Sequence, residues 1–303
     1  MRACFLVLGL VFGVQALHIQ SLHAEEVLPI WPGAAPGETT RSRGEMLPYK
    51  PEEMPPVVRM VNITEPTITV YPAQHPNGTA VVIFPGGGFV KVVTNKEGSE
   101  PAGWLNDLGI SAFVVSYRTK IEGEAASWKR PLQDAQRAVS LIRTQAKKWN
   151  IHPDRIGVMG FSAGGQIAAR LLNANGNPPE KHLDEIDDVS SRPDFALLIY
   201  PWNLYDKKSD SLAVGMTVPA NCAPTFLVHT DDDHASSLAS VLFYAGLKRQ
   251  GIPAELHVYG NGGHGYGLRT VPGSQVSSWP GHAANWLQSR GLLRAPAANS
   301  QKR

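Results

Sequence analysis

The chain has 303 residues, with 28 Lys and Arg against 26 Asp and Glu and a net charge of +2. The basic residues are scattered along the sequence rather than gathered in one stripe, which argues against nucleic acid as a partner. Because 43% of the residues are hydrophobic, a chain of this length can bury one large core, and we expect one main domain.

The N-terminus has the layout of a secretory signal peptide. Arg2 precedes an apolar segment that ends near Val14 and is short for a membrane span. We expect cleavage after Ala24, hence a secreted or periplasmic protein without stable membrane insertion. An uncleaved anchor is the alternative, because Leu22 is large for a cleavage site. Cleavage would leave Cys222 as the lone cysteine, so no intrachain disulfide is expected.

Strand and helix patterns alternate after an irregular start. Residues 25–66 are rich in Pro, Gly and charge and predict an extended surface arm. Residues 67–71 alternate at period two, as in the edge strand of a hairpin. The clearest helix spans 131–149 and carries one apolar stripe. Apolar runs predict further strands that are buried on both faces: 80–84, 112–115, 156–159, 195–200, 225–229 and 254–259.

Alternating strands and helices predict an α/β fold, a mostly parallel sheet with helices on both faces. Active residues then belong at the carboxyl ends of the strands. Polar inserts at 173–193 and 203–223 stand where a lid or substrate wall could form, but both are too short for a lid domain. The predicted organisation is a signal peptide, an arm, a catalytic domain and a flexible tail: 1–24, 25–66, 67–293 and 294–303.

Gly160-Phe161-Ser162-Ala163-Gly164 stands between a strand-type run and a helix-type run. A G-x-S-x-G in that context is typical of a nucleophile elbow, a tight turn that exposes the serine. Side chains at Gly160 or Gly164 would clash in such a turn. We therefore predict Ser162 as a nucleophile. The alternative is a glycine-rich turn with a surface serine, since the chain contains 29 glycines.

A serine nucleophile needs a base and a group that orients the base. Downstream of the elbow, Asp231, Asp232 and Asp233 follow one predicted strand, and His264 follows the last strand in a glycine-rich loop. The order serine, acid, histidine fits this kind of fold, so His264 is the predicted base and one aspartate the acid. The other aspartates would interact with the dipole of the following helix. These aspartates and His234 lack a second set of metal ligands, and no metal is expected.

Phe84-Pro85-Gly86-Gly87-Gly88-Phe89 follows a predicted strand. Its glycines would let the N–H groups of Gly87 and Gly88 point at an oxyanion, together with the N–H of Ala163. A phosphate loop is the alternative, but no phosphate-binding motif follows, and no organic cofactor is expected. We expect aromatic residues beside these loops to wall the acyl or sugar site, with packing in the core as the alternative: Phe89, Trp202 and Tyr266.

Taken in this order, the motifs resemble the α/β-hydrolase esterases of the BD-FAE and acetyl xylan esterase-like group. The resemblance covers nearly all of the chain after the signal peptide, from about residue 29 to 292. It implies an α/β-hydrolase fold and a secreted serine esterase. Such an enzyme removes short acyl groups, above all acetyl, from carbohydrate such as acetylated xylan through an acyl-enzyme. The resemblance rests on these segments: 28–33, 84–89, 116–118, 160–165, 191–195 and 262–268.

The resemblance also bears on the acid. An ungapped match running back from Gly251-Ile252-Pro253 places the acid at Asp232, whereas a match running forward from the strand end places it at Asp233. We predict Asp232, because the helical stretch anchors the first match. The chain departs from the group's pattern where relatives often have histidine: Pro85, Lys96 and Gln166. These departures concern the support of the glycine loop and the substrate preference.

Two other functions share parts of this pattern. Dipeptidyl- and prolyl-type serine peptidases have the same order of triad residues, but they usually carry a propeller-like domain, and no such repeat is visible. A non-catalytic hydrolase-fold binding protein would be expected to lose a triad residue, and this chain keeps all three types. The expected partner is therefore a small acyl ester or an acetylated carbohydrate.

Overall fold

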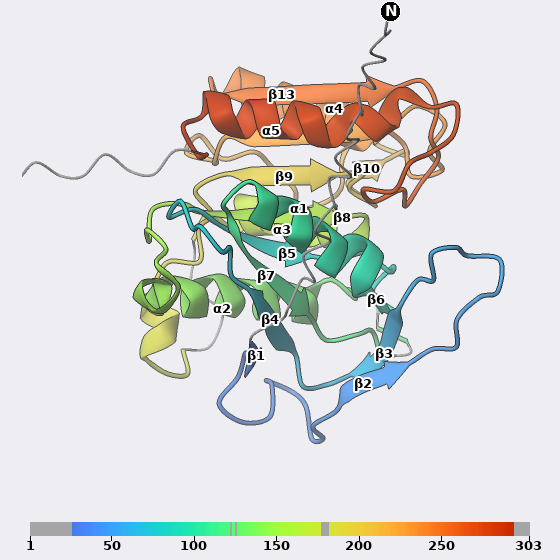
Figure 1. Ribbon diagram of the computed structural model, residues 1–303. Coiled ribbons are helices and arrows are strands. Elements are labelled where there is room, and N and C mark those ends of the chain that lie inside the picture. The colour runs from blue at the N-terminus through green and yellow to red at the C-terminus, as the bar shows by residue number, and fades with distance from the viewer. Residues whose placement is uncertain (1–25, 122, 125, 177–181, 294–303) are drawn as a thin grey trace, which may run out of the picture.

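The computed structural model describes residues 26–121, 123–124, 126–176 and 182–293. The predicted signal peptide and tail lie outside them. One eight-stranded sheet has the order β1-β4-β7-β5-β8-β9-β12-β13 (Figure 1). β4 pairs antiparallel with β1 and β7, and the other pairs are parallel. In sheet order the strands are β1 Glu26–Pro29, β4 Thr67–Tyr71, β7 Ser111–Ser116, β5 Ala80–Phe84, β8 Ile156–Phe161, β9 Ala196–Ile199, β12 Thr225–Thr230 and β13 Ala254–Tyr259.

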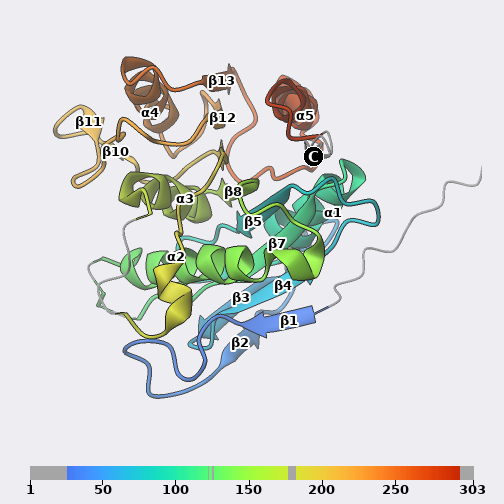
Figure 2. The ribbon, with the colours of Figure 1, turned by 90° about the vertical axis from the view of Figure 1, so that its left-hand side faces the viewer.

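Helices cover both faces of the sheet, as the sequence predicts. α2, α3 and α4 lie on one face and α1 and α5 on the other (Figure 2). A separate apolar cluster lies under each layer. The α-helices are α1 Glu100–Asp107, α2 Lys129–Thr144, α3 Ala163–Ala174, α4 Leu238–Arg249 and α5 Trp279–Ser289. Short helices of other types are the π-helix η1 Asn95–Ser99 and the 3-10 helices η2 Ala146–Trp149, η3 Glu185–Asp188 and η4 Gln275–Ser278. The helix expected over 131–149 is thus confirmed as α2 followed by η2.

The segment expected to be an extended arm contains regular strands. β1 is the edge of the main sheet, so β4 is its second strand and not the edge that the sequence predicts. β2 (Arg43–Met46) and β3 (Arg59–Ile63) form a second sheet with β6 (Val92–Val93). The residues of β2 are mostly exposed and lack apolar alternation. β2 exists because its backbone pairs with β3. Its sequence has no alternation of apolar and polar residues from which a strand could be predicted.

A buried ion pair fixes the N-terminal segment to α2. Trp31 Nε1 donates to Asp134 Oδ1 at 2.8 Å, and Arg118 lies 2.9 Å from the same oxygen. The side chains of Arg118 and Asp134 are both 0% exposed. Loss of either partner would leave an uncompensated buried charge, which is strongly destabilising.

The two polar inserts form small local structures. Residues 203–223 contain the hairpin of β10 (Tyr205–Asp206) and β11 (Ser211–Leu212), and the described part of 173–193 contains η3. Across the described parts of the chain, no helix has both the length and the apolar character that crossing a bilayer requires.

Candidate active site

Ser162 lies in the tight turn between β8 and α3. Its φ is 51° and its ψ is −117°, a conformation that residues with a side chain rarely adopt. A Cβ at Gly164 would lie 1.9 Å from the carbonyl oxygen of Phe84, and one at Gly160 would lie 2.2 Å from that of Gly164. The glycines therefore permit the close approach of α3 to the sheet that holds Ser162 at the end of a central strand.

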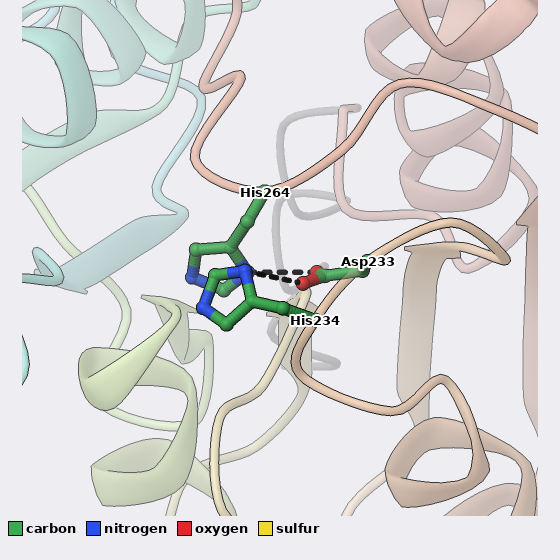
Figure 3. Close-up of side chains that lie close together, drawn as sticks. All are labelled: Asp233, His234 and His264. Carbon is green, nitrogen blue, oxygen red and sulfur yellow. Dashed lines mark hydrogen bonds and ion pairs between the residues drawn. The ribbon is translucent and has the colours of Figure 1, made fainter.

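His264, in the loop after β13, connects Ser162 to a carboxylate. Its Nε2 lies 2.7 Å from Ser162 Oγ, and its Nδ1 lies 2.7 Å from Asp233 Oδ2. Figure 3 shows the ring of His264 directed at this carboxylate. Because a carboxylate accepts hydrogen bonds, Nδ1 carries the proton and Nε2 is left to accept the proton of the serine hydroxyl. This is the arrangement that activates a serine.

The prediction that Asp232 orients His264 is corrected by this geometry. Asp232 is exposed, and its two oxygens accept hydrogen bonds from the backbone N–H groups of Gly263 at 2.8 Å and Gly262 at 3.1 Å. The residue that contacts the His264 ring is Asp233, which the match running forward from the strand end had offered as the alternative. Neighbouring side chains in this turn point in different directions, so a one-residue shift in the match selects a carboxylate that binds loop backbone.

Asp233 is buried, and several donors surround it. His229 Nε2 lies 3.2 Å from Oδ2, and the N–H of Ala235 donates to Oδ1 at 2.7 Å. Burial raises the pKa of Asp233, but the hydrogen bonds from His229, His264 and the N–H of Ala235 outweigh that effect and hold the pKa well below its usual range. The carboxylate is therefore ionised at neutral pH.

His229 is a site residue that the sequence analysis does not identify, because it belongs to a run that predicts only a buried strand. Its ring is fully buried, with Nδ1 2.9 Å from Ser240 Oγ and Nε2 2.7 Å from the carbonyl oxygen of Ala235. Since Nε2 faces a carbonyl and the Asp233 carboxylate, it carries the proton, and Nδ1 accepts from the hydroxyl. The sequence did offer one signal for His229: an ionisable side chain in a strand predicted to be buried, shortly before Asp231, Asp232 and Asp233.

The predicted oxyanion donors are Gly87 and Gly88 of the glycine loop and Ala163, which follows Ser162 in the chain. Gly87 and Gly88 line the same cavity as Ser162. Gly87 has a φ of +132°, and a Cβ there would lie 2.2 Å from the carbonyl oxygen of Lys91. Ala163 is the first residue of α3, where backbone N–H groups have no acceptor within the helix.

The glycine loop is braced although Pro85 stands where the resemblance implies a histidine. The hydroxyl of Tyr117 donates to the carbonyl oxygen of Pro85 at 2.6 Å, and the N–H of Gly86 donates to Glu97 Oε2 at 2.8 Å. The other oxygen of Glu97 accepts from the Tyr200 hydroxyl at 2.8 Å. Burial raises the pKa of Glu97. Glu97 therefore ties the loop to residues at the end of β9.

A cavity of about 730 Å³ opens over the serine and histidine. Of the aromatic residues expected to wall it, Trp202 lines the cavity, whereas Phe89 and Tyr266 do not. Phe89 is 1% exposed and packs its ring against Trp202, and Tyr266 is 4% exposed and packs against Tyr200. The expectation for these two is corrected in favour of the core alternative, because neighbouring rings cover them.

Another part of the wall comes from residues 52–59, within the segment expected to be an arm. Arg269 holds this stretch, since its guanidinium donates to the carbonyl oxygens of Pro55 and Pro56 while it pairs with Glu100 at 2.6 Å. Among the described residues that line the cavity, none belongs to 173–193 or 203–223. The described residues of the inserts thus do not form the substrate wall that their place in the chain suggested.

Asp233, His234 and His264 offer metal-binding atoms within 4.8 Å of one another (Figure 3). His234 is exposed, and its ring lies 4.7 Å from that of His264. A metal ion held by all three would compete with the hydrogen bond between Asp233 and His264 for the same carboxylate and ring. The geometry therefore favours proton transfer at this cluster, and an enzyme without a metal stays a prediction.

The sheet, the turn at Ser162 and its link through His264 to Asp233 define an α/β hydrolase. The model of the BD-FAE family matches residues 68–199, a stretch that includes the glycine loop and the elbow. An acetyl ester-xyloside bifunctional hydrolase from Caldicellulosiruptor lactoaceticus has a similar structure, with a TM-score of 0.70 and 29% identity over 90% of this chain and 99% of that one.

Two curated relatives also match. An acetylxylan esterase of Xylanibacter ruminicola is 27% identical over 65% of this chain and 43% of the relative. Endo-1,4-beta-xylanase B of Butyrivibrio fibrisolvens is 31% identical over 66% of this chain and 34% of the relative. The chain thus spans less than half the length of either relative. With the chain's motifs, these matches support a BD-FAE and acetyl xylan esterase-like α/β hydrolase.

Proposed function

We propose that this chain is a serine carboxylic-ester hydrolase that removes short acyl groups, above all acetyl, from carbohydrate such as acetylated xylan. The observation that carries the proposal is the hydrogen-bonded chain from Ser162 through His264 to Asp233 beneath an open cavity. The names of an acetylxylan esterase and an acetyl ester-xyloside hydrolase among the similar proteins support the substrate class.

The proposed reaction proceeds through an acyl-enzyme. Ser162 Oγ attacks the ester carbonyl while His264 Nε2 accepts the hydroxyl proton, and the imidazolium then donates that proton to the leaving alcohol. Water, activated by the same nitrogen, releases the acid and restores the serine. Asp233 holds the reactive tautomer of His264 and stabilises its charged form.

Electrostatic stabilisation of the tetrahedral intermediate is assigned to backbone N–H groups. Gly87 and Gly88 line the cavity together with Ser162 and have no side chain to fill it, and Ala163 follows Ser162 in the chain. Donors of this kind typically contribute a factor of about 10² to 10³ each in kcat. Trp202 is proposed to contact the sugar, since its half-buried indole lines the cavity and an aromatic ring suits the apolar face of a carbohydrate.

The first test compares hydrolysis of p-nitrophenyl acetate by the wild type, Ser162→Ala and Ser237→Ala. Ser237 makes no side-chain cap bond at the start of α4 and serves as a matched control. We expect Ser162→Ala alone to abolish the release of p-nitrophenol. Equal rates for all three proteins would refute the nucleophile and favour a non-catalytic hydrolase fold.

Substrate class is tested with acetylated xylo-oligosaccharides, longer acyl esters and peptide amides. We expect the highest kcat/KM for the acetylated oligosaccharides. Preferential cleavage of proline-containing peptides would instead support the peptidase alternative.

Secretion is part of the proposal and is tested separately. We expect the full chain, expressed in a bacterial host, to be exported and to begin at Glu25 when its N-terminus is sequenced. Retention in the membrane fraction with an intact N-terminus would support the anchor alternative.

A further inference from the structure

The cavity over Ser162 is lined by several charged side chains, and both arginines among them are paired. Arg59 pairs with Glu53 at 2.5 Å, and Arg269 pairs with Glu100 at 2.6 Å. The two lysines of the lining, Lys91 and Lys96, differ from these arginines in having no ion-pair partner. Within the described part of the chain, neither ammonium has a carboxylate within 4.0 Å. Two half-buried cations therefore face the substrate space without a bound counter-charge.

Lys96 lies in η1, and its side chain approaches the loop that carries the catalytic histidine. A Cβ at Gly267 would lie 3.2 Å from Lys96 Cγ. The carboxylates that act electrostatically on Lys96 are each hydrogen-bonded elsewhere: Glu97 to Tyr200 at 2.8 Å, Glu100 to Arg269 at 2.6 Å and Glu53 to Arg59 at 2.5 Å. Burial lowers the pKa of Lys96 more than these acids raise it. The ammonium therefore remains poorly compensated.

Lys91 approaches from the other end of the glycine loop. A Cβ at Gly87 would lie 2.8 Å from Lys91 Cγ, so the stem of Lys91 packs against the proposed oxyanion donor. The remaining carboxylate of the lining, Glu52, is exposed to water. Its field is screened there by solvent and salt, so it compensates the two lysines only weakly.

The acyl group in the proposed function is short, whereas the cavity measures about 730 Å³. Most of that space must then hold the alcohol part of the ester. We propose that Lys96 and Lys91 form an anion subsite for this alcohol part, and that the substrate class is an acylated carbohydrate bearing a carboxylate, such as an acetylated oligosaccharide with a uronic acid unit. This inference rests on the proposed esterase function and adds to it the charge of the substrate.

The test compares two acetylated xylo-oligosaccharides that differ at one group. One carries a uronic acid branch, and in the other the same carboxyl is reduced to a primary alcohol. The measured quantity is the ratio of kcat/KM for the acidic over the neutral compound. This ratio is independent of the fraction of folded enzyme, so a partly unfolded variant still gives an answer.

We expect the wild type to prefer the acidic compound, and Lys96→Met to lower the ratio about tenfold, as for a lost hydrogen bond to a charged group. Lys91→Met should lower it in the same direction, and Lys96→Arg should retain it. Lys248→Met is the matched control, because Lys248 is exposed in α4 and outside the cavity lining. The preference should also weaken as the salt concentration rises.

A wild-type ratio of one or less, or the same ratio in Lys96→Met, would overturn the anion subsite. A preference for a succinyl over an acetyl ester of one neutral sugar, without preference for the acidic oligosaccharide, would place the anion on the acyl side and also refute the proposal. If Ser162→Ala abolishes hydrolysis of p-nitrophenyl acetate while the ratio is one, only this inference fails. If the wild type hydrolyses no ester, the proposed function itself fails.

Discussion

His229 Nε2 lies 3.2 Å from Asp233 Oδ2, the oxygen that also binds His264 Nδ1 at 2.7 Å. One carboxylate oxygen thus lies between two imidazoles, one at the edge of the cavity and one fully buried. The buried ring is fixed in turn by Ser240 and by the carbonyl oxygen of Ala235. His229 is therefore placed to position Asp233 without touching the substrate.

Replacement of His229 is expected to impair the reaction through Asp233. His229→Phe should lower kcat about tenfold and the free energy of unfolding by about 1–3 kcal/mol, because it removes a donor from the carboxylate and leaves buried polar groups unpaired. Hydrolysis of p-nitrophenyl acetate and urea unfolding measure the two effects.

Ser240→Ala is the matched control, since it removes the outer contact of the His229 ring and leaves the ring beside Asp233. It should reduce stability with a smaller loss of kcat. If both variants lose stability and neither loses kcat, the role of His229 is purely structural.

The two neighbouring aspartates are expected to differ sharply. Asp233→Asn should lower kcat by about 10⁴, because an amide can no longer hold the proton on Nδ1 of His264. Asp232→Asn should cost less than about tenfold, since Asp232 does not contact His264 and the amide oxygen can still accept from one of the two loop N–H groups that Asp232 binds. Steady-state kinetics on one acetate ester decides between them. The reverse ranking would restore Asp232 as the acid.

Ser162, His264 and the glycine loop could be predicted from short sequence motifs. Each stands beside a strand whose buried character is readable from its apolar run, and the parallel sheet brings the strand ends together. The carboxylate that orients His264 was harder to predict from the sequence. Asp232 and Asp233 are adjacent, and the choice depends on which side of one turn each carboxylate points to, a property of backbone conformation and not of residue type.

The support of the site was largely hidden from sequence reasoning. Glu97 braces the glycine loop from η1, and the wall at 52–59 comes from a segment with no apolar periodicity. These contacts join residues far apart in the chain through single hydrogen bonds, such as that of Glu97 to Tyr200. No spacing rule relates such residues, so only the folded arrangement reveals them.

Glu97 is expected to make stability depend on pH. Burial raises its pKa in the folded protein above the unfolded value of about 4.3. Its contribution is therefore fully present below about pH 4 and is lost as the pH rises through the folded pKa. Glu97→Gln cannot titrate, so the stability of the wild type relative to this variant should fall as the pH rises over that window.

Urea unfolding of both proteins at a series of pH values measures this difference. A tenfold difference in proton affinity between the folded and unfolded states corresponds to about 1.4 kcal/mol. A difference that does not change with pH would show that Glu97 titrates alike in both states, and one that grows with pH would show that its hydrogen bonds outweigh burial.

The close approach of α3 to the sheet is expected to tolerate no added methyl group at the elbow. Gly164→Ala would place a Cβ 1.9 Å from the carbonyl oxygen of Phe84, so α3 and β5 would have to separate. We expect a loss of about 3 kcal/mol or more in the free energy of unfolding, together with a large loss of kcat as Ser162 moves. The control is Gly281→Ala in α5, where an added Cβ meets nothing within 4 Å and alanine should be neutral or stabilise by up to about 1 kcal/mol. Thermal unfolding and acetate hydrolysis of both variants test this, and equal behaviour of the two would contradict the packing argument.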